Sequence, residues 1–232
     1  MRNPALWFIV PFMLVHAHCG TSNSGRPTAS ADALVREAQA RFTYKGKPIP
    51  PFFLHDLAGG RGAHDYNLTG MGHRICALSV EGLFVGQGYL ASSYDLLQTR
   101  KEGAFYVFDY YEDPLAKDGP ASVHGYRFVG TTPKGTTVLE YYLGSRSSAF
   151  YPGVSLVRFA IEETFDFAGG TSPPASRSRQ RLVMRYVGRM AWGDRVTRDV
   201  RLDGAKLILG PATTCLPDYE NLIQPAQTIL LE

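Results

Sequence analysis

The residues best suited to chemistry lie in one glycine-rich stretch of the chain, Phe53 to Cys76. This stretch holds three histidines, each nine positions after the last, and two of them precede an aspartate: His55, His64, His73, Asp56 and Asp65. Imidazoles and carboxylates on one loop can converge on a transition metal such as zinc. The spacing matches no compact ligand motif, however, and His-Asp pairs in such loops also serve turns and caps. Loop structure is therefore the preferred interpretation. A metal site at His55, His64, His73 and Asp65 is the alternative.

Other catalytic motifs in the sequence are incomplete. Gly153 to Val157 begins a nucleophile elbow but lacks its final glycine. Glu162 and Glu163 are adjacent in a strand-like run, so they point to opposite faces and cannot flank one bond. We expect no cofactor and favour a non-catalytic role.

Aromatic residues offer a different kind of site. Clusters at Phe105 to Tyr111 and at Tyr141 and Tyr142 could line a groove or barrel for a small apolar ligand. Rings on strands also fill cores and stabilise cross-strand pairs, and we prefer that interpretation.

The N-terminus has the features of a secretory signal. Arg2 precedes an apolar run from Ala5 to Val15, which is too short to span a bilayer as a helix. We predict a signal peptide over residues 1–17, followed by a flexible polar tether over 18–31. Cys19 resembles the lipidated cysteine of bacterial lipoprotein signals, although histidines stand where small residues are usual. The prediction is export to the periplasm or cell envelope, with lipidation of Cys19 as an alternative to a soluble mature chain.

Two further cysteines, Cys76 and Cys215, fit an exported protein. A disulfide across so long a loop would stabilise the fold by roughly 4–5 kcal/mol in the chain-entropy model. The alternative is two separate thiols, and the sequence does not decide between them.

Charge argues against two classes of partner. The net charge of +3 is too small to indicate nucleic-acid binding or attraction to a membrane surface. Residues 177–201 hold eight arginines, which we interpret as a solvated face of a sheet. The membrane is expected as a partner only through the N-terminal lipid.

The strongest structural pattern is a long β-hairpin from Val154 to Met190. In its second arm, Leu182, Met184, Tyr186 and Met190 share one parity, and Arg179, Arg181, Arg185 and Arg189 share the other. Because strand side chains alternate between faces, each arm should have one apolar and one charged face. The Gly/Ser/Pro-rich connector between the arms favours a loop.

A register for this hairpin follows from charge matching. Pairing Glu162 with Arg185 and Ile161 with Tyr186 sets opposite charges and apolar residues across from each other, each charge pair contributing roughly 0.2–1 kcal/mol. Glu163 falls on the apolar parity in this scheme, and we expect a β-bulge there.

The remaining chain supplies one helix and more strands. Asp32 to Phe42 should be helical, with an apolar stripe through Ala38. Expected strands follow the glycine-rich loop at Ala58 to Gly72: Arg74–Val80, Leu83–Tyr89, Ala104–Tyr111, Val123–Val129, Thr137–Leu143, Thr197–Leu202, Ala205–Leu209 and an edge strand at Thr228–Leu231. Ala104–Tyr111 should be central because both of its faces are apolar. An Asp203-Gly204 turn should set Val200 opposite Leu207.

Together these patterns predict a mainly β protein, an antiparallel β-sandwich or barrel with one short N-terminal helix. Residues 32–72 should form the helix and an extended segment, and residues 73–232 the β domain. We expect an exported domain that binds or scaffolds, with an envelope protein or a small apolar ligand as candidate partners. A metal-dependent envelope enzyme is the alternative.

Overall fold

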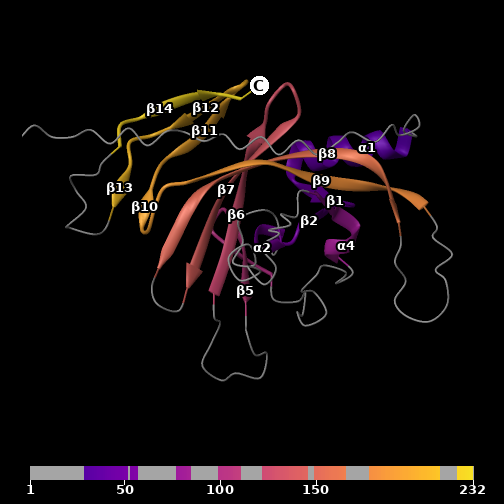
Figure 1. The fold of residues 1–232 in the computed structure, drawn as a ribbon, viewed down its shortest axis with the longest axis horizontal. Coiled ribbons are helices and arrows are strands. Elements are labelled where there is room, and N and C mark those ends of the chain that lie inside the picture. Colours follow the sequence, from indigo (N-terminus) through magenta and orange to yellow (C-terminus); the bar gives the residue numbers. More distant parts are fainter. Residues whose placement is uncertain are drawn as a thin grey trace, which may run out of the picture.

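A computed structural model describes residues 29–51, 53–56, 77–84, 99–110, 122–145, 149–165, 178–214 and 224–231. The described part is mainly β, as predicted, and it is built on one seven-stranded antiparallel sheet (Figure 1). The strands of this main sheet are, in spatial order, β3 (Ala77–Ser79), β9 (Ser178–Ala191), β8 (Phe150–Phe165), β7 (Thr136–Ser145), β6 (Ser122–Thr131), β5 (Phe105–Tyr110) and β4 (Arg100–Glu102).

Smaller sheets and three helices complete the described elements. A three-stranded sheet has the order β11 (Val200–Asp203), β12 (Lys206–Leu209) and β14 (Gln227–Leu230). Two short ribbons pair β1 (Thr43–Tyr44) with β2 (Lys47–Pro48) and β10 (Val196–Thr197) with β13 (Thr213–Thr214). The helices are α1 (Ala29–Arg41), α2 (Phe53–Asp56) and α4 (Val80–Phe84). None of the described helices is long and apolar enough to cross a membrane.

The long hairpin is confirmed as β8 and β9, but its predicted register is wrong. Ile161 lies opposite Leu182 and Glu162 opposite Arg181, a slip of four residues from the predicted pairing. A slip by an even number keeps every side chain on its face, so apolar matching could not separate the two registers. Glu162 still forms a two-pronged ion pair with Arg185, reaching along the strand to it.

A β-bulge is present in this hairpin, though at Val187 and not at Glu163. Val157 pairs with Tyr186 and Leu156 pairs with Gly188, which leaves Val187 as the extra residue. Glu163 pairs regularly with Gln180 and is exposed. An extra residue on one strand reverses the side-chain alternation beyond it.

The bulge therefore exchanges the faces of the last residues of β9. Met184 and Tyr186 pack with the helices on one face, which we call the inner face, whereas Met190 packs on the opposite, outer face. Arg189 turns inward, where a guanidinium N–H donates to the Leu54 carbonyl at 3.3 Å and the cation lies 4.4 Å from the Tyr141 ring centroid. The prediction that these arginines share one solvated face is wrong for Arg189.

Arg181 departs from that prediction too. Its residue is only 9% exposed, and its Nε lies 3.8 Å from a carboxylate oxygen of Glu81 on α4. The short helix and β3 pack beside β9 here, so part of the arginine face is covered.

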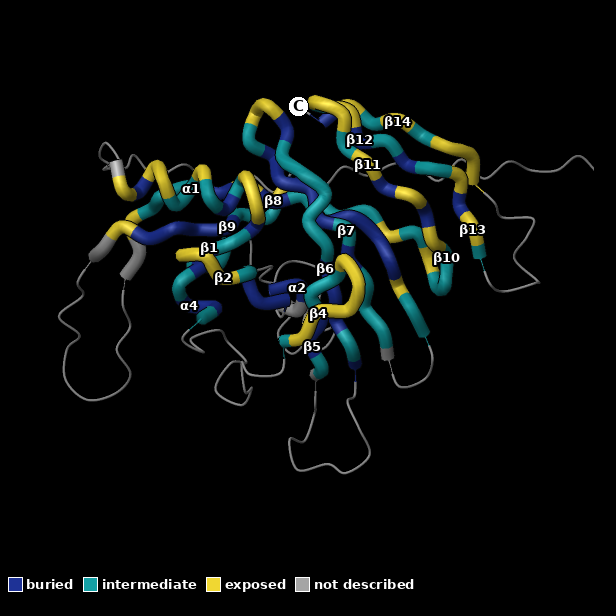
Figure 2. Tube along the Cα trace, turned by 180° about the vertical axis from the view of Figure 1, so that it is seen from behind, coloured by how far each residue is buried: buried dark blue, intermediate teal, exposed yellow. Residues whose placement is uncertain are grey.

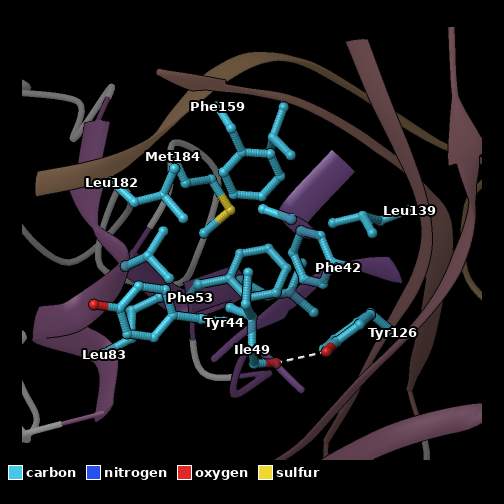
Figure 3. Packing of buried hydrophobic residues seen from close by; sticks show 14 of the residues in the cluster. Phe42, Tyr44, Ile49, Phe53, Leu83, Tyr126, Leu139, Phe159, Leu182 and Met184 are labelled. Carbon is cyan, nitrogen blue, oxygen red and sulfur yellow. Dashed lines mark hydrogen bonds between the residues drawn. The ribbon is translucent and has the colours of Figure 1, made fainter. Parts of the chain in front are cut away.

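The inner core forms between α1 and the main sheet. The predicted helix is confirmed, beginning at Ala29 and so inside the predicted tether, and its Ala38 and the following Phe42 are fully buried. The Phe42 ring meets Tyr126 edge-on at 4.9 Å, and the Tyr126 hydroxyl donates to the Ile49 carbonyl at 2.6 Å (Figure 3). Burial raises the pKa of Tyr126 well above its usual value, so this hydroxyl stays protonated as a donor.

A second core lies between the outer face and the three-stranded sheet. Val138 and Val154 of the main sheet pack against Val200, Leu207 and Leu209 of that small sheet. Two packed sheets make the architecture sandwich-like, and the described strands do not close into a barrel. The barrel on which the apolar-carrier hypothesis depended is therefore not formed by the described residues.

The β11–β12 hairpin is confirmed with a shifted register. Val200 lies opposite Leu209, not Leu207, because Asp203 pairs with Lys206 and the turn is Gly204-Ala205. Gly204 has φ of 56°, and glycine in the first central position suits a two-residue hairpin turn. The predicted edge strand at the C-terminal end is confirmed as β14, paired with β12.

Several strand predictions are wrong in part. Leu83 and Phe84 lie in helix α4, because burying Val80 and Leu83 needs helical spacing. Residues Val196 to Asp203 form two short strands and not one. β5 is not central but second from the edge, because the unpredicted β4 follows it. The three residues of β4 are charged and exposed throughout (Figure 2), which protects the sheet edge from further pairing.

Candidate ligand-binding surface

The site residues predicted from sequence mostly fall outside the described part of the chain. His55 and Asp56 belong to helix α2, but the structure does not describe their side chains. His64, Asp65, His73, Cys19, Cys76 and Cys215 lie outside the described residues altogether, so the metal, lipid and disulfide hypotheses stay predictions. Among the residues that are described, no three histidine, cysteine, aspartate or glutamate side chains gather as a metal site would need.

The register of the main sheet brings a different set of side chains together. Val107, Gly125, Tyr142 and Pro152 lie in one row across β5, β6, β7 and β8. Tyr142 has the same parity as Val138 in β7, so this row belongs to the outer face. It lies beyond the residues that the three-stranded sheet covers.

Three half-buried rings form a continuous strip on this part of the outer face. The Tyr142 ring lies 5.4 Å from Phe105 on β5 and 5.1 Å from Phe150 on β8, measured between centroids. We call Phe105, Tyr142 and Phe150 the aromatic strip. The planes are tilted by 57° and 31°, within the range that attractive aromatic pairs adopt.

Gly125 makes the position of the central ring possible. A Cβ atom on this residue would lie 2.5 Å from two ring carbons of Tyr142 and 2.8 Å from its hydroxyl oxygen. The ring therefore rests directly on the backbone of β6, where any larger residue would lift it. Glycine within a strand often marks such a close approach.

Charged groups border the strip along strand β4. Arg100 forms ion pairs with Glu102, at 2.7 Å, and with Asp109 of β5. Glu102 lies opposite Phe105 in the register, so this polar edge is continuous with the strip. The second carboxylate oxygen of Asp109 is buried and accepts no hydrogen bond from any described group. A buried acceptor of this kind is unusual and favours a donor from elsewhere.

The Tyr142 hydroxyl lies in the field of this polar edge. Burial raises the pKa of Tyr142 to about 12, the nearby carboxylates of Glu102 and Asp109 raise it as well, and Arg100 opposes them. The phenol is therefore neutral at any physiological pH. It can both donate and accept a hydrogen bond there.

The opposite end of the strip is held by the chain after β9. The Phe150 N–H donates to the Asp194 carboxylate at 2.8 Å, and the Arg195 N–H donates to the Phe150 carbonyl at 2.6 Å. Gly193 and Arg195 both adopt positive φ, of 112° and 56°, which turns the chain tightly against β8. These hydrogen bonds fix the backbone of Phe150 at this end of the strip.

Sequence reasoning grouped these aromatics without separating their faces. Phe105 and Tyr142 are outer, whereas Tyr106, Phe108 and Tyr141 pack into the inner core. The side chain of Tyr110 and all of Tyr111 lie outside the described residues. Strand parity could have separated Phe105 from Tyr106, but assigning Phe150 to the strip needed the register of two further strand pairs.

No protein-family model, curated protein or solved structure matches this chain. Its function is therefore inferred from the side chains that the fold brings together.

Proposed function

We propose that this chain is a non-catalytic binding domain that holds a carbohydrate against the aromatic strip. The observation that carries the proposal is the row of three partly buried rings, with the polar edge of Arg100, Glu102 and Asp109 at its Phe105 end. Binding sites commonly combine an apolar surface with a few placed polar groups that fix orientation. This arrangement supports binding without a nucleophile or a metal.

A sugar ring matches this surface in two ways. Its C–H groups form an apolar face that packs on the negative face of an aromatic ring, and its hydroxyls radiate from the rim. Rim hydroxyls can donate to carboxylates such as Asp109 and accept from a guanidinium such as Arg100, and hydrogen bonds to charged groups are the stronger kind. The neutral Tyr142 hydroxyl can serve in either role.

The experiment is a binding titration by calorimetry of the full chain with a panel of soluble polysaccharides. We expect saturable binding to at least one of them, and on the order of tenfold or greater loss of affinity in Phe150→Ala, since truncating an aromatic residue that anchors a ligand costs over about 1 kcal/mol. Asp109→Asn should weaken the same complex by removing the charged acceptor.

A matched control is available one residue along the same strand. Tyr151 is 46% exposed and, next to Phe150 on β8, it points to the opposite face. Tyr151→Ala should leave the affinity unchanged. Equal losses in Tyr151→Ala and Phe150→Ala, or no saturable binding to any polysaccharide, would refute the proposal.

We also propose that the protein acts outside the cytoplasm, in the periplasm or cell envelope. The apolar run after Arg2 and the polar segment behind it support this. Mass spectrometry of the N-terminus of the protein produced in a bacterial host separates the outcomes. Cleavage after Ala17 supports simple export, a diacylglyceryl Cys19 supports lipid anchoring, and an intact Met1 in the cytoplasm contradicts both.

A further inference from the structure

A second polar cluster, separate from the aromatic strip, surrounds Arg198. This residue lies between β10 and β11 and is only 6% exposed. One terminal nitrogen, Nη1, donates to the carbonyl oxygens of Gly210 and Pro225, both at 3.4 Å, and the other, Nη2, donates to the side-chain oxygen of Gln224 at 2.5 Å. The cation also lies 5.4 Å from the centre of the Trp192 ring. All of these acceptors are neutral.

The charge of Arg198 is thus buried without a counter-charge in the described part of the chain. Its Nε–H is buried and reaches no acceptor there, and neither does the buried indole N–H of Trp192. Desolvation lowers the pKa of Arg198, which reflects the same imbalance. Burying a guanidinium is unfavourable unless an anion and further hydrogen bonds compensate it.

The geometry of the Arg198 guanidinium indicates which kind of anion would fit. Nε and Nη2 form one edge of the planar group, and their N–H bonds point in parallel. Gln224 supplies a single oxygen to this edge, at Nη2, and leaves Nε without an acceptor. A carboxylate or phosphate has two oxygens at the spacing that this edge matches, which is why such pairs are often two-pronged.

We propose that the Nε–Nη2 edge of Arg198 is an oxyanion-binding site, with Gln224 as the group that the oxyanion displaces. Gln224 belongs to an exposed stretch, residues 224–226, so its side chain can move into solvent and open the edge. The displaced amide loses one hydrogen bond, whereas the oxyanion gains two charge-assisted ones. The class of ligand is an oxyanion carried by a carboxylate or a phosphate.

Trp192 provides the readout for a test on the full chain. The chain has two tryptophans, so in a Trp7→Phe background fluorescence reports on Trp192 alone. Inorganic phosphate and acetate are titrated separately against sodium chloride at matched ionic strength. We expect a saturable change in fluorescence with phosphate, acetate or both, and none with chloride. At about one hundred times Kd, the Tm should rise on the order of 5 °C.

Two substitutions at Gln224 test the geometry. Gln224→Glu places a carboxylate of the chain itself on the edge, so this variant should have a higher Tm than the parent in chloride and should no longer respond to phosphate or acetate. Gln224→Ala removes the competing amide, so it should retain the response with a lower apparent Kd. The two anions distinguish their sources, since a response to acetate alone indicates a carboxylate ligand and one to phosphate alone a phosphorylated ligand.

A third substitution removes the edge. Arg198→Lys keeps the charge but not the parallel N–H pair, so the saturable response should disappear. A response that persists in Arg198→Lys would overturn the proposal, as would a Gln224→Glu variant no more stable than Gln224→Ala. The latter comparison needs no Arg198 variant and holds even if Arg198→Lys fails to fold.

Discussion

Adding one methyl group at Gly125 tests whether the aromatic strip is arranged as described. In Gly125→Ala the new Cβ would meet the Tyr142 ring at 2.5 Å, a separation that real Cβ atoms do not show, so the ring has to lift from the sheet. Lifting it weakens the contacts of Tyr142 with Phe105 and Phe150. Each such pair is worth about 0.5–1.5 kcal/mol, so the free energy of unfolding should fall by about 1–3 kcal/mol.

Thermal unfolding measures this loss, and Tm should fall by about 5 °C for a chain of this length. The loss should depend on the ring, since Gly125→Ala in a Tyr142→Ala background no longer meets these ring atoms and gains the better strand propensity of alanine. A double-mutant cycle therefore should give a coupling energy of about 1–3 kcal/mol between positions 125 and 142.

A second readout of the same variant is the ionisation of Tyr142. Burial is the main cause of its pKa of about 12, so a lifted ring should ionise nearer the ordinary tyrosine value. Absorbance titration of the tyrosinate, compared with Tyr142→Phe, isolates this group. If Gly125→Ala destabilises equally with and without Tyr142, and the alkaline titration does not move, then the ring does not rest on β6.

Three further predictions concern charge and pH. The pKa of Tyr142 in the folded protein lies above the unfolded value of about 10. The stability that the neutral phenol contributes is therefore present below pH 10 and is lost as the pH rises through 12. Tyr142→Phe should flatten the fall in Tm over that pH range. Glu162→Gln removes the two-pronged partner of Arg185 and should cost about 1 kcal/mol in urea unfolding, and the loss should shrink in high salt. Arg127→Met alone or Glu140→Leu alone breaks a partly buried ion pair and should lower the free energy of unfolding by about 2 kcal/mol. The double variant should recover most of this loss, which a double-mutant cycle by chemical denaturation can measure.

The sequence predicted those features that depend on neighbouring residues. Alternation identified both arms of the long hairpin, and four-residue spacing identified the helix around Ala38. The Asp-Gly pair identified the β11–β12 hairpin, although the turn itself is Gly204-Ala205. Each of these patterns is local and repeats over several residues. They were sufficient for the class of fold, which is mainly β and antiparallel with one N-terminal helix, but they left a sandwich and a barrel as alternatives.

Features that depend on pairing were not predictable in the same way. A four-residue slip keeps all apolar residues of β8 and β9 on their faces, so the register depended on where the arms begin and end. The bulge at Val187 depends on one residue that carries no distinctive chemistry. Its effect is large, since it places Arg189 and Met190 on faces opposite to those that parity assigned them.

Both proposed sites belong to this second category. The aromatic strip needs three strand registers to be known before Phe105, Tyr142 and Phe150 can be placed side by side. The Arg198 site joins a residue after β10 to the stretch before β14, and the sequence offered only one more arginine in a run of eight. Chemistry assembled from distant short segments has no local periodicity by which to find it.

The lengths of the strands explain why the small sheet does not extend over the aromatic strip. The strands of the small sheet have four residues each and span about 13 Å, whereas β8 has sixteen residues and spans about 53 Å. The small sheet covers Val154 and Leu156 on β8, and Phe150 lies four residues before Val154, about one small-sheet length away. A second layer of this size cannot reach both places. Contiguous rings that stay partly exposed on a sheet face favour a surface that binds something. The same rings would be ordinary core residues under a longer second sheet, so the shortness of β11, β12 and β14 is what turns Phe105, Tyr142 and Phe150 into a candidate site.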